Sequence, residues 1–230
     1  MHYAPAVRLA ISLVVAVTAL TFVSCGGNDD ETHAPVPVGQ RFVTAEEASG
    51  SKPDPVEARQ TTENFDEFIA VLTDASIDPD KDEMTTVFRH AGFKAAGLDA
   101  RFFGETHSSE TSPHVFSSFI ELGSEEGARS ALDWLETDMH KPCPMSCATQ
   151  ISAFDVDGIA GARGVHRIAT AEDIEAVGAT EQRPLDSYWV GFTDGDVVYT
   201  VDLQGPPGSV SEKQAKEIAN AYHQRLTGGG

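Results

Sequence analysis

The chain of 230 residues has 36 acidic and 16 basic side chains, which gives a formal net charge of −20. A surface this negative repels phosphate backbones and anionic headgroups, and the sequence has no basic stripe that could bind either of them. Nucleic acid is therefore excluded as a partner, and we do not expect the protein to bind lipid headgroups other than through an acyl anchor.

The chain opens with a segment typical of a secretory signal peptide. Arg8 is followed by an uncharged stretch from Leu9 to Val23, which at about fifteen residues has the length of an apolar signal core. A transmembrane helix needs about twenty apolar residues, and a polar tract begins directly after Cys25. The pattern predicts that residues 1–24 are a cleaved signal peptide.

The leader ends in "TFVSC", in which Val23 and Ser24 precede Cys25. This ending resembles the lipobox of bacterial lipoproteins, although Phe22 replaces the usual Leu. The resemblance implies that the Cys25 thiol carries a diacylglyceryl group and that the new amino terminus is acylated. Two acyl chains, at about 0.8 kcal/mol per buried CH₂, give stable anchoring to the cell membrane on its extracytoplasmic face. The alternatives are a free cysteine in an ordinary signal peptide or an uncleaved anchor.

The segment that follows, residues 25–60, is rich in Gly, Pro, Ser, Thr and acidic residues. It has almost no apolar periodicity, so it is predicted to be a disordered acidic linker. A flexible tether of this length would hold a domain on the order of 30 Å from the membrane. The remaining residues, 61–228, are predicted to form an extracytoplasmic domain.

Four helices are predicted in this domain from apolar side chains at helical spacing. Asn64 with Glu67, and Ser211 with Gln214, are capping boxes at the first and last of them. Gly92 is predicted to end the second helix, and the third stops before Pro142. The residues expected to face the core are Phe65, Phe68, Ile69 and Leu72; Met84, Val87, Phe88 and Ala91; Ala128, Leu132, Leu135 and Met139; and Ala215, Ile218, Ala219, Tyr222 and Leu226.

Strands are predicted at residues 100–105, 114–122 and 164–169, and a hairpin at residues 187–203. The Asp194-Gly195 pair between alternating apolar residues predicts a type I′ turn. The order strand, strand, helix occurs twice, at residues 100–139 and 164–226. We therefore expect an α+β fold, an antiparallel sheet with helices packed on one face, built from two similar strand–strand–helix halves.

A lipobox, an acidic linker and a strand that runs into a helix, as in "FIELGSEEGARSALDWL" (Phe119 to Leu135), occur together here. The combination resembles a broad set of predicted actinobacterial membrane lipoproteins of uncharacterised function. This resemblance implies a location and an α+β domain. It implies no reaction.

The sharpest chemical cluster is "MHKPCPMSC". Cys143 and Cys147 are predicted to form a disulfide outside the cytoplasm, a local staple that restricts the unfolded chain by about 2 kcal/mol. The alternative is a copper or thiol-redox site made by His140, Cys143, Met145 and Cys147, since these soft ligands select Cu(I). The C-P-x-x-C spacing resembles Sco-type copper chaperones, but there the motif starts a helix, whereas here it follows one.

Two further groups of residues could bind metal ions. Asp78, Asp80 and Asp82 have the alternate spacing of a calcium loop, but Glu83 and Arg89 stand where the loop needs Gly and a carboxylate. These acids are better explained as a cap for the following helix.

The second group lies in "ETHSSETSPH", between two predicted strands. It places His107 and His114 with Glu105 and Glu110 in a possible zinc patch, with a solvated turn as the alternative.

No G-x-S-x-G elbow and no H-E-x-x-H motif occurs in the sequence. We therefore expect a non-enzymatic binding or interaction module of the cell envelope, with no cofactor and with a protein or small ligand as its unknown partner. A further alternative is that the acidic surface docks a basic partner, in which case the association would weaken with salt.

Overall fold

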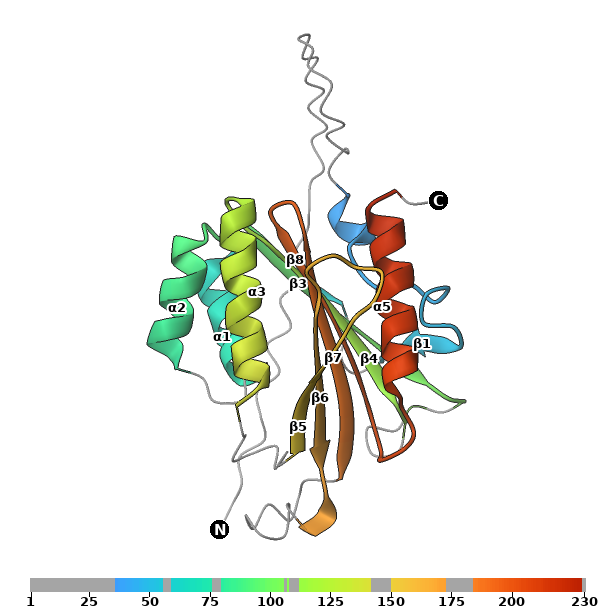
Figure 1. Ribbon diagram of the computed structural model, residues 1–230. Helices are drawn as coiled ribbons and strands as arrows, with labels where there is room; N and C mark the ends of the chain where they lie inside the picture. The colour runs from blue at the N-terminus through green and yellow to red at the C-terminus, as the bar shows by residue number, and fades with distance from the viewer. Residues whose placement is uncertain are drawn as a thin grey trace, which may run out of the picture. The chain divides into compact units, whose positions relative to one another are not determined.

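An eight-stranded antiparallel sheet organises the part of the chain that the computed structural model describes, residues 36–55, 59–75, 80–105, 107, 112–141, 150–172 and 184–228 (Figure 1). The fold is α+β and the sheet is not closed into a barrel, as the sequence predicts. Among these residues, no helix is both long enough and apolar enough to cross a membrane.

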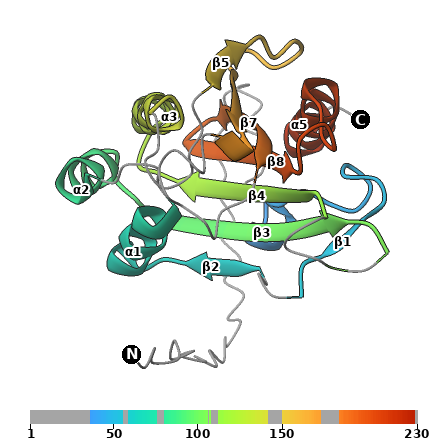
Figure 2. The same ribbon diagram turned by 90° about the horizontal axis from the view of Figure 1, so that it is seen from below.

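The strand order is β1-β3-β4-β8-β7-β6-β5, and β2 pairs with the same edge of β3 as β1 does. Figure 2 shows β2, β3 and β4 side by side. The strands are β1 (Ser51–Pro53), β2 (Gln60–Thr62), β3 (Ala95–Phe103), β4 (His114–Glu121), β5 (Gln150–Phe154), β6 (Arg163–Ala169), β7 (Leu185–Asp194) and β8 (Val197–Gly205).

The predicted hairpin is confirmed as β7 and β8, but its turn lies one residue later than expected. Asp194 pairs with Val197 across the two strands, so the loop consists of Gly195 and Asp196. Gly195 has a φ of 57°, a left-handed conformation that glycine adopts without steric cost.

The four predicted helices are confirmed, and so are the predicted N-cap side chains of the first and last of them. They are α1 (Phe65–Ala75), α2 (Lys81–His90), α3 (Glu125–Met139) and α5 (Glu212–Leu226), and a short 3₁₀ turn, η1 (Val38–Gln40), precedes them. The Asn64 side chain accepts from the amides of Asp66 and Glu67, and Ser211 accepts from that of Gln214. Gly92 follows α2 with a φ of 75°, as expected of a residue that ends a helix.

Helices cover both faces of the sheet, whereas the sequence predicts them on one face. Successive residues of a strand point to opposite faces: Val190 and Phe192 of β7 pack in the cluster that contains α5, and Trp189 packs in the cluster that contains α1, α2 and α3. Figure 1 shows α5 on one side of the sheet and the other three helices on the opposite side. The physical reason is that β7 places large apolar side chains on both of its faces, Trp189 on one and Val190 and Phe192 on the other, and each face must be covered.

The order strand, strand, helix recurs as β3-β4-α3 and β7-β8-α5. The hairpins β3-β4 and β7-β8 lie next to each other because β4 pairs with β8. Each hairpin sends its helix to a different face of the sheet. The second half therefore repeats the order of the first without repeating its packing.

Residues 36–55, which the sequence analysis assigned to a disordered linker, belong to the folded domain. Phe42 and Val43 are each 1% exposed and pack in the same cluster as α5. The Arg41 guanidinium pairs with the Glu121 carboxylate on β4. The segment has little local periodicity because its regular elements, η1 and β1, are only three residues long each, and long-range contacts hold it in place.

Candidate functional site

Three side chains from separate parts of the chain meet beside the sheet edge formed by β1 and β3. Asp54 directly follows β1, and its amide donates to the carbonyl of Ala100, which holds it against β3. His107 lies in the connection between β3 and β4, and His114 is the first residue of β4. We refer to Asp54, His107 and His114 as the histidine cluster.

Both imidazoles of the histidine cluster contact the same carboxylate oxygen. The Nε2 atom of His107 lies 3.0 Å from Oδ2 of Asp54, and the Nε2 atom of His114 lies 3.3 Å from the same oxygen. The three donor atoms all lie within 4.8 Å of one another. Two imidazole nitrogens and one carboxylate are donors that divalent transition metals accept.

Aromatic rings hold the two imidazoles in place. The Phe102 ring meets His107 edge to face at 5.1 Å between centroids, and Phe116 stacks on His114 at 6.1 Å. The side chains of Asp54, His114 and His107 are 3%, 12% and 21% exposed. The carboxylate is thus withdrawn from water, while the side chain of His107 stays partly open to it.

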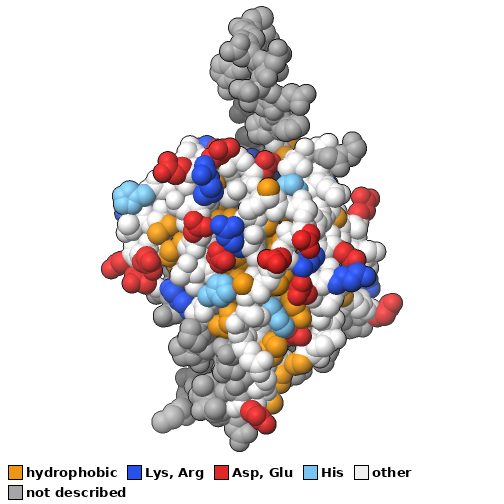
Figure 3. All heavy atoms as spheres, viewed as in Figure 1, with side chains coloured by type: hydrophobic (Ala, Val, Ile, Leu, Met, Phe, Trp, Pro, Cys, Tyr) orange, Lys and Arg blue, Asp and Glu red, His pale blue; other side chains and the backbone are white. Residues whose placement is uncertain are grey.

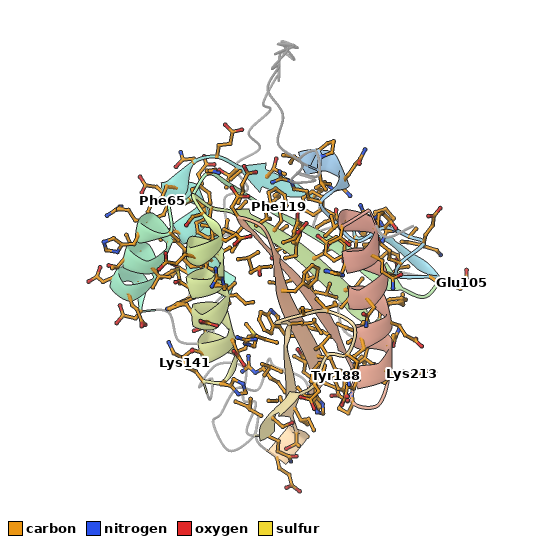
Figure 4. The ribbon with its side chains drawn as sticks, turned by 45° about the horizontal axis from the view of Figure 1, so that its top comes forward. Phe65, Glu105, Phe119, Lys141, Tyr188 and Lys213 are labelled. Carbon is orange, nitrogen blue, oxygen red and sulfur yellow. The ribbon has the colours of Figure 1, made fainter. Side chains whose placement is uncertain are left out.

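The structure brings together His107 and His114, the two histidines of the predicted zinc patch. Glu105 is exposed at the outer edge of the fold (Figure 4), where its backbone carbonyl accepts from Lys52. Glu110 lies outside the described residues. The carboxylate that completes the cluster is Asp54, which sequence reasoning missed because it assigned this residue to the linker.

A network of polar side chains lies on the same sheet face as His114. Its members are Ser187, Asp202 and Gln204; the hydroxyl of Ser187 donates to the Asp202 carboxylate at 2.8 Å, and the Gln204 amide donates to its other oxygen. Burial raises the pKa of Asp202, although these hydrogen bonds and the charge of Arg167 oppose the rise. Gln204 stands directly opposite His114 in the β4–β8 register, so the network adjoins the histidine cluster.

A second histidine–aspartate pair lies on the opposite sheet face. Nε2 of His166 on β6 is 2.6 Å from Oδ1 of Asp186 on β7, and the His166 ring stacks on Tyr188 at 4.1 Å. Partial burial and the charge of Asp186 raise the pKa of Tyr188, which Figure 4 shows near the lower end of the sheet. This pair does not belong to a larger group of metal-binding side chains within the described ranges.

The other residues singled out in the sequence have these positions. Asp80 is the N-cap of α2 and accepts from the amides of Asp82 and Glu83, which is the capping role expected of these acids; Asp78 lies outside the described residues. His140 is exposed at the C-cap of α3. The predicted lipidation site Cys25, the predicted disulfide between Cys143 and Cys147, and the copper ligand Met145 also lie outside the described residues.

Acidic and basic side chains are interspersed on the face that carries α3 and α5, with histidines among them (Figure 3). The acidic residues are not gathered into one patch on this face. The alternative of an acidic docking surface for a basic partner therefore gains no support from it.

No family model matches the chain, and no curated protein sequence matches it. Among solved structures, the fold is similar to the extracellular domain of PknH from Mycobacterium tuberculosis, with a TM-score of 0.52. The superposition covers 85% of this chain and 99% of that domain at 13% sequence identity. The likeness shows a shared fold, an α+β domain with helices on both faces of an antiparallel sheet.

Proposed function

We propose that this protein is a lipid-anchored binding module on the extracytoplasmic face of the cell membrane. The observation that carries the proposal is the fold. It matches 99% of the length of a domain that is described as extracellular. The leader of the chain, which is typical of an exported protein, supports the same location.

The anchor is the finer part of the proposal and rests on the sequence. The apolar stretch from Leu9 to Val23 is too short to span a membrane, and Cys25 follows it in a context that resembles a lipobox. The folded domain begins by residue 36, so about ten residues separate it from Cys25.

Binding, and not catalysis, is the activity we propose for the domain. His114, Ser187 and Asp202 lie on strands, on one face of the sheet, and packing and hydrogen bonds hold their side chains in place. Rigid polar groups next to aromatic rings suit recognition of a protein or a small envelope ligand.

The anchor is tested by metabolic labelling with palmitate in a bacterial host that lipidates exported proteins. We expect the wild-type protein and Cys143→Ala to be labelled and to remain in the membrane fraction. Cys25→Ala should lose the label and appear in the medium. Labelling that persists in Cys25→Ala, or that disappears equally in Cys143→Ala, would overturn the anchor at Cys25.

A further inference from the structure

We propose that Asp54, His107 and His114 form a binding site for a divalent transition-metal ion, for which Zn²⁺ is the probe. The site is independent of the lipid anchor, because it uses only residues of the folded domain. It would give the domain a fixed cation next to the polar network of the same sheet face.

The separations of the donor atoms suit one shared ion. Zn²⁺ binds imidazole nitrogen and carboxylate oxygen at about 2.0–2.2 Å, so two donors on the same tetrahedral ion lie about 3.3–3.6 Å apart. The two histidine nitrogens lie 3.0 and 3.3 Å from Oδ2 of Asp54. All three donor atoms lie within 4.8 Å of one another, so small adjustments of the side chains bring them around one ion.

The fold positions each donor with a different constraint. Asp54 is held by the bond from its amide to the Ala100 carbonyl, and His114 is held by its place in the β3–β4–β8 ladder. Phe102 and Phe116 fix the two imidazole planes. Donors that are oriented in advance lose little conformational entropy when an ion binds.

The donor set selects the class of ion. Two of the three donors are imidazole nitrogens, which suit Zn²⁺ and its neighbours and not Ca²⁺ or Mg²⁺, ions that prefer oxygen ligands. Three protein ligands leave a position open for water or for a group of a bound partner, as in zinc sites that exchange a ligand. The partial exposure of His107, 21% of its side chain, leaves an approach from solvent.

A different explanation of the same geometry is that both imidazoles simply donate hydrogen bonds to Asp54. The two explanations differ in where the Nε2 protons go. In a metal complex each Nε2 lone pair faces the ion and the proton moves to Nδ1 or is released, so zinc affinity must fall as the pH is lowered. In the hydrogen-bonded cluster zinc has no effect on either ring.

The test is calorimetric titration of the full-length protein, with its free thiols alkylated, against ZnCl₂. We expect one saturable site per chain, lost or weakened at least tenfold in His107→Ala and in Asp54→Asn. The matched control is His166→Ala, which removes a histidine that also contacts a carboxylate, on Asp186, but lies outside the cluster. It should bind zinc as the wild type does, and millimolar Ca²⁺ should not displace the ion.

Absence of zinc binding, equal affinity in the wild type and His107→Ala, or displacement by Ca²⁺ would overturn the proposal. The Asp54 side chain is only 3% exposed, and a variant there could fail to fold; the wild-type protein then decides the question. Nitrogen NMR of its imidazoles should show zinc shifting the Nε2 signals of two histidines. If zinc shifts none, the cluster is a hydrogen-bonded structural element.

Discussion

The phenol of Tyr222 on α5 donates a hydrogen bond to the backbone carbonyl of Arg41, which lies 181 residues earlier in the chain. One turn further along α5, the Arg225 guanidinium donates to the carbonyls of Gln40 and Phe42. The last helix thus satisfies three successive carbonyls in a stretch that belongs to no β-strand and no α-helix. This explains how a segment of low local order becomes part of the core.

Replacing Tyr222 by Phe should destabilise the domain by about 1–3 kcal/mol, because it leaves the buried Arg41 carbonyl without its donor. Urea unfolding followed by circular dichroism measures the change in the free energy of unfolding. Tyr188→Phe, which removes a hydroxyl from a half-buried position on β7, is the matched control and should change stability by less than half of that amount. Equal effects of the two substitutions would contradict the role given to the Tyr222 hydroxyl.

A chain that begins at residue 61, the boundary expected from the sequence, should be much less stable than one that begins at residue 36. Full burial of one large apolar side chain contributes about 1.5–3 kcal/mol, so the loss of Phe42 and Val43 alone costs about 3–6 kcal/mol. That is a large part of the usual stability of a domain. Thermal unfolding of both chains measures the difference, and equal melting temperatures would show that residues 36–60 are dispensable.

Neither the start of the folded domain near residue 36 nor the complete histidine cluster could be predicted from the sequence, and the reason is the same for both. Capping boxes such as Asn64 with Glu67, and alternation such as that of β8, are local signals, and the structure confirms the helices and strands that they predict. Phe42 and Asp54 have no such signal, since their partners lie on α5, β3 and β4. The sequence predicts that His107 and His114 lie close together. It does not predict Asp54, the carboxylate that both contact, because Asp54 reaches them only through the pairing of β1 and β3.

Replacing Gly97 on β3 by Ala is predicted to destabilise the domain. A Cβ atom there would lie 2.5 Å from the Phe119 ring and 2.7 Å from the Phe42 ring, so the two edge-to-face rings would have to move. Overpacking of this kind costs about 1–3 kcal/mol. Gly39→Ala is the control, because nothing lies within 4 Å of the added carbon.

The two alanine variants are compared by urea unfolding. Gly97→Ala should unfold at a lower urea concentration than the wild type, and Gly39→Ala should unfold at the wild-type concentration or slightly above. If Gly97→Ala matched the wild type, Phe42 would not be packed against Phe119, and the inclusion of residues 36–55 in the core would fail with it.

Asp202 should make the stability of the domain depend on pH. Burial raises its pKa in the folded state above the ordinary value of 3.8, so between these two values the folded chain binds more protons than the unfolded chain. The free energy of unfolding therefore falls as the pH rises through this window, and the loss stays constant above it. Asp202→Asn removes this contribution, so its stability relative to the wild type should improve as the pH rises from about 3.8.

Ser187→Ala tests the same carboxyl in the opposite direction. It removes a hydrogen bond that favours the ionised form of Asp202, so it should raise the folded-state pKa further and deepen the loss of stability at neutral pH. Urea unfolding of the wild type and both variants between about pH 3 and pH 8 measures the three profiles, a range that spans the ordinary carboxyl value. Both substitutions act on the same carboxyl group. The free energy of unfolding relative to the wild type should therefore rise with pH in Asp202→Asn and fall with pH in Ser187→Ala. A change of the same sign in both variants would mean that Asp202 is not the group responsible.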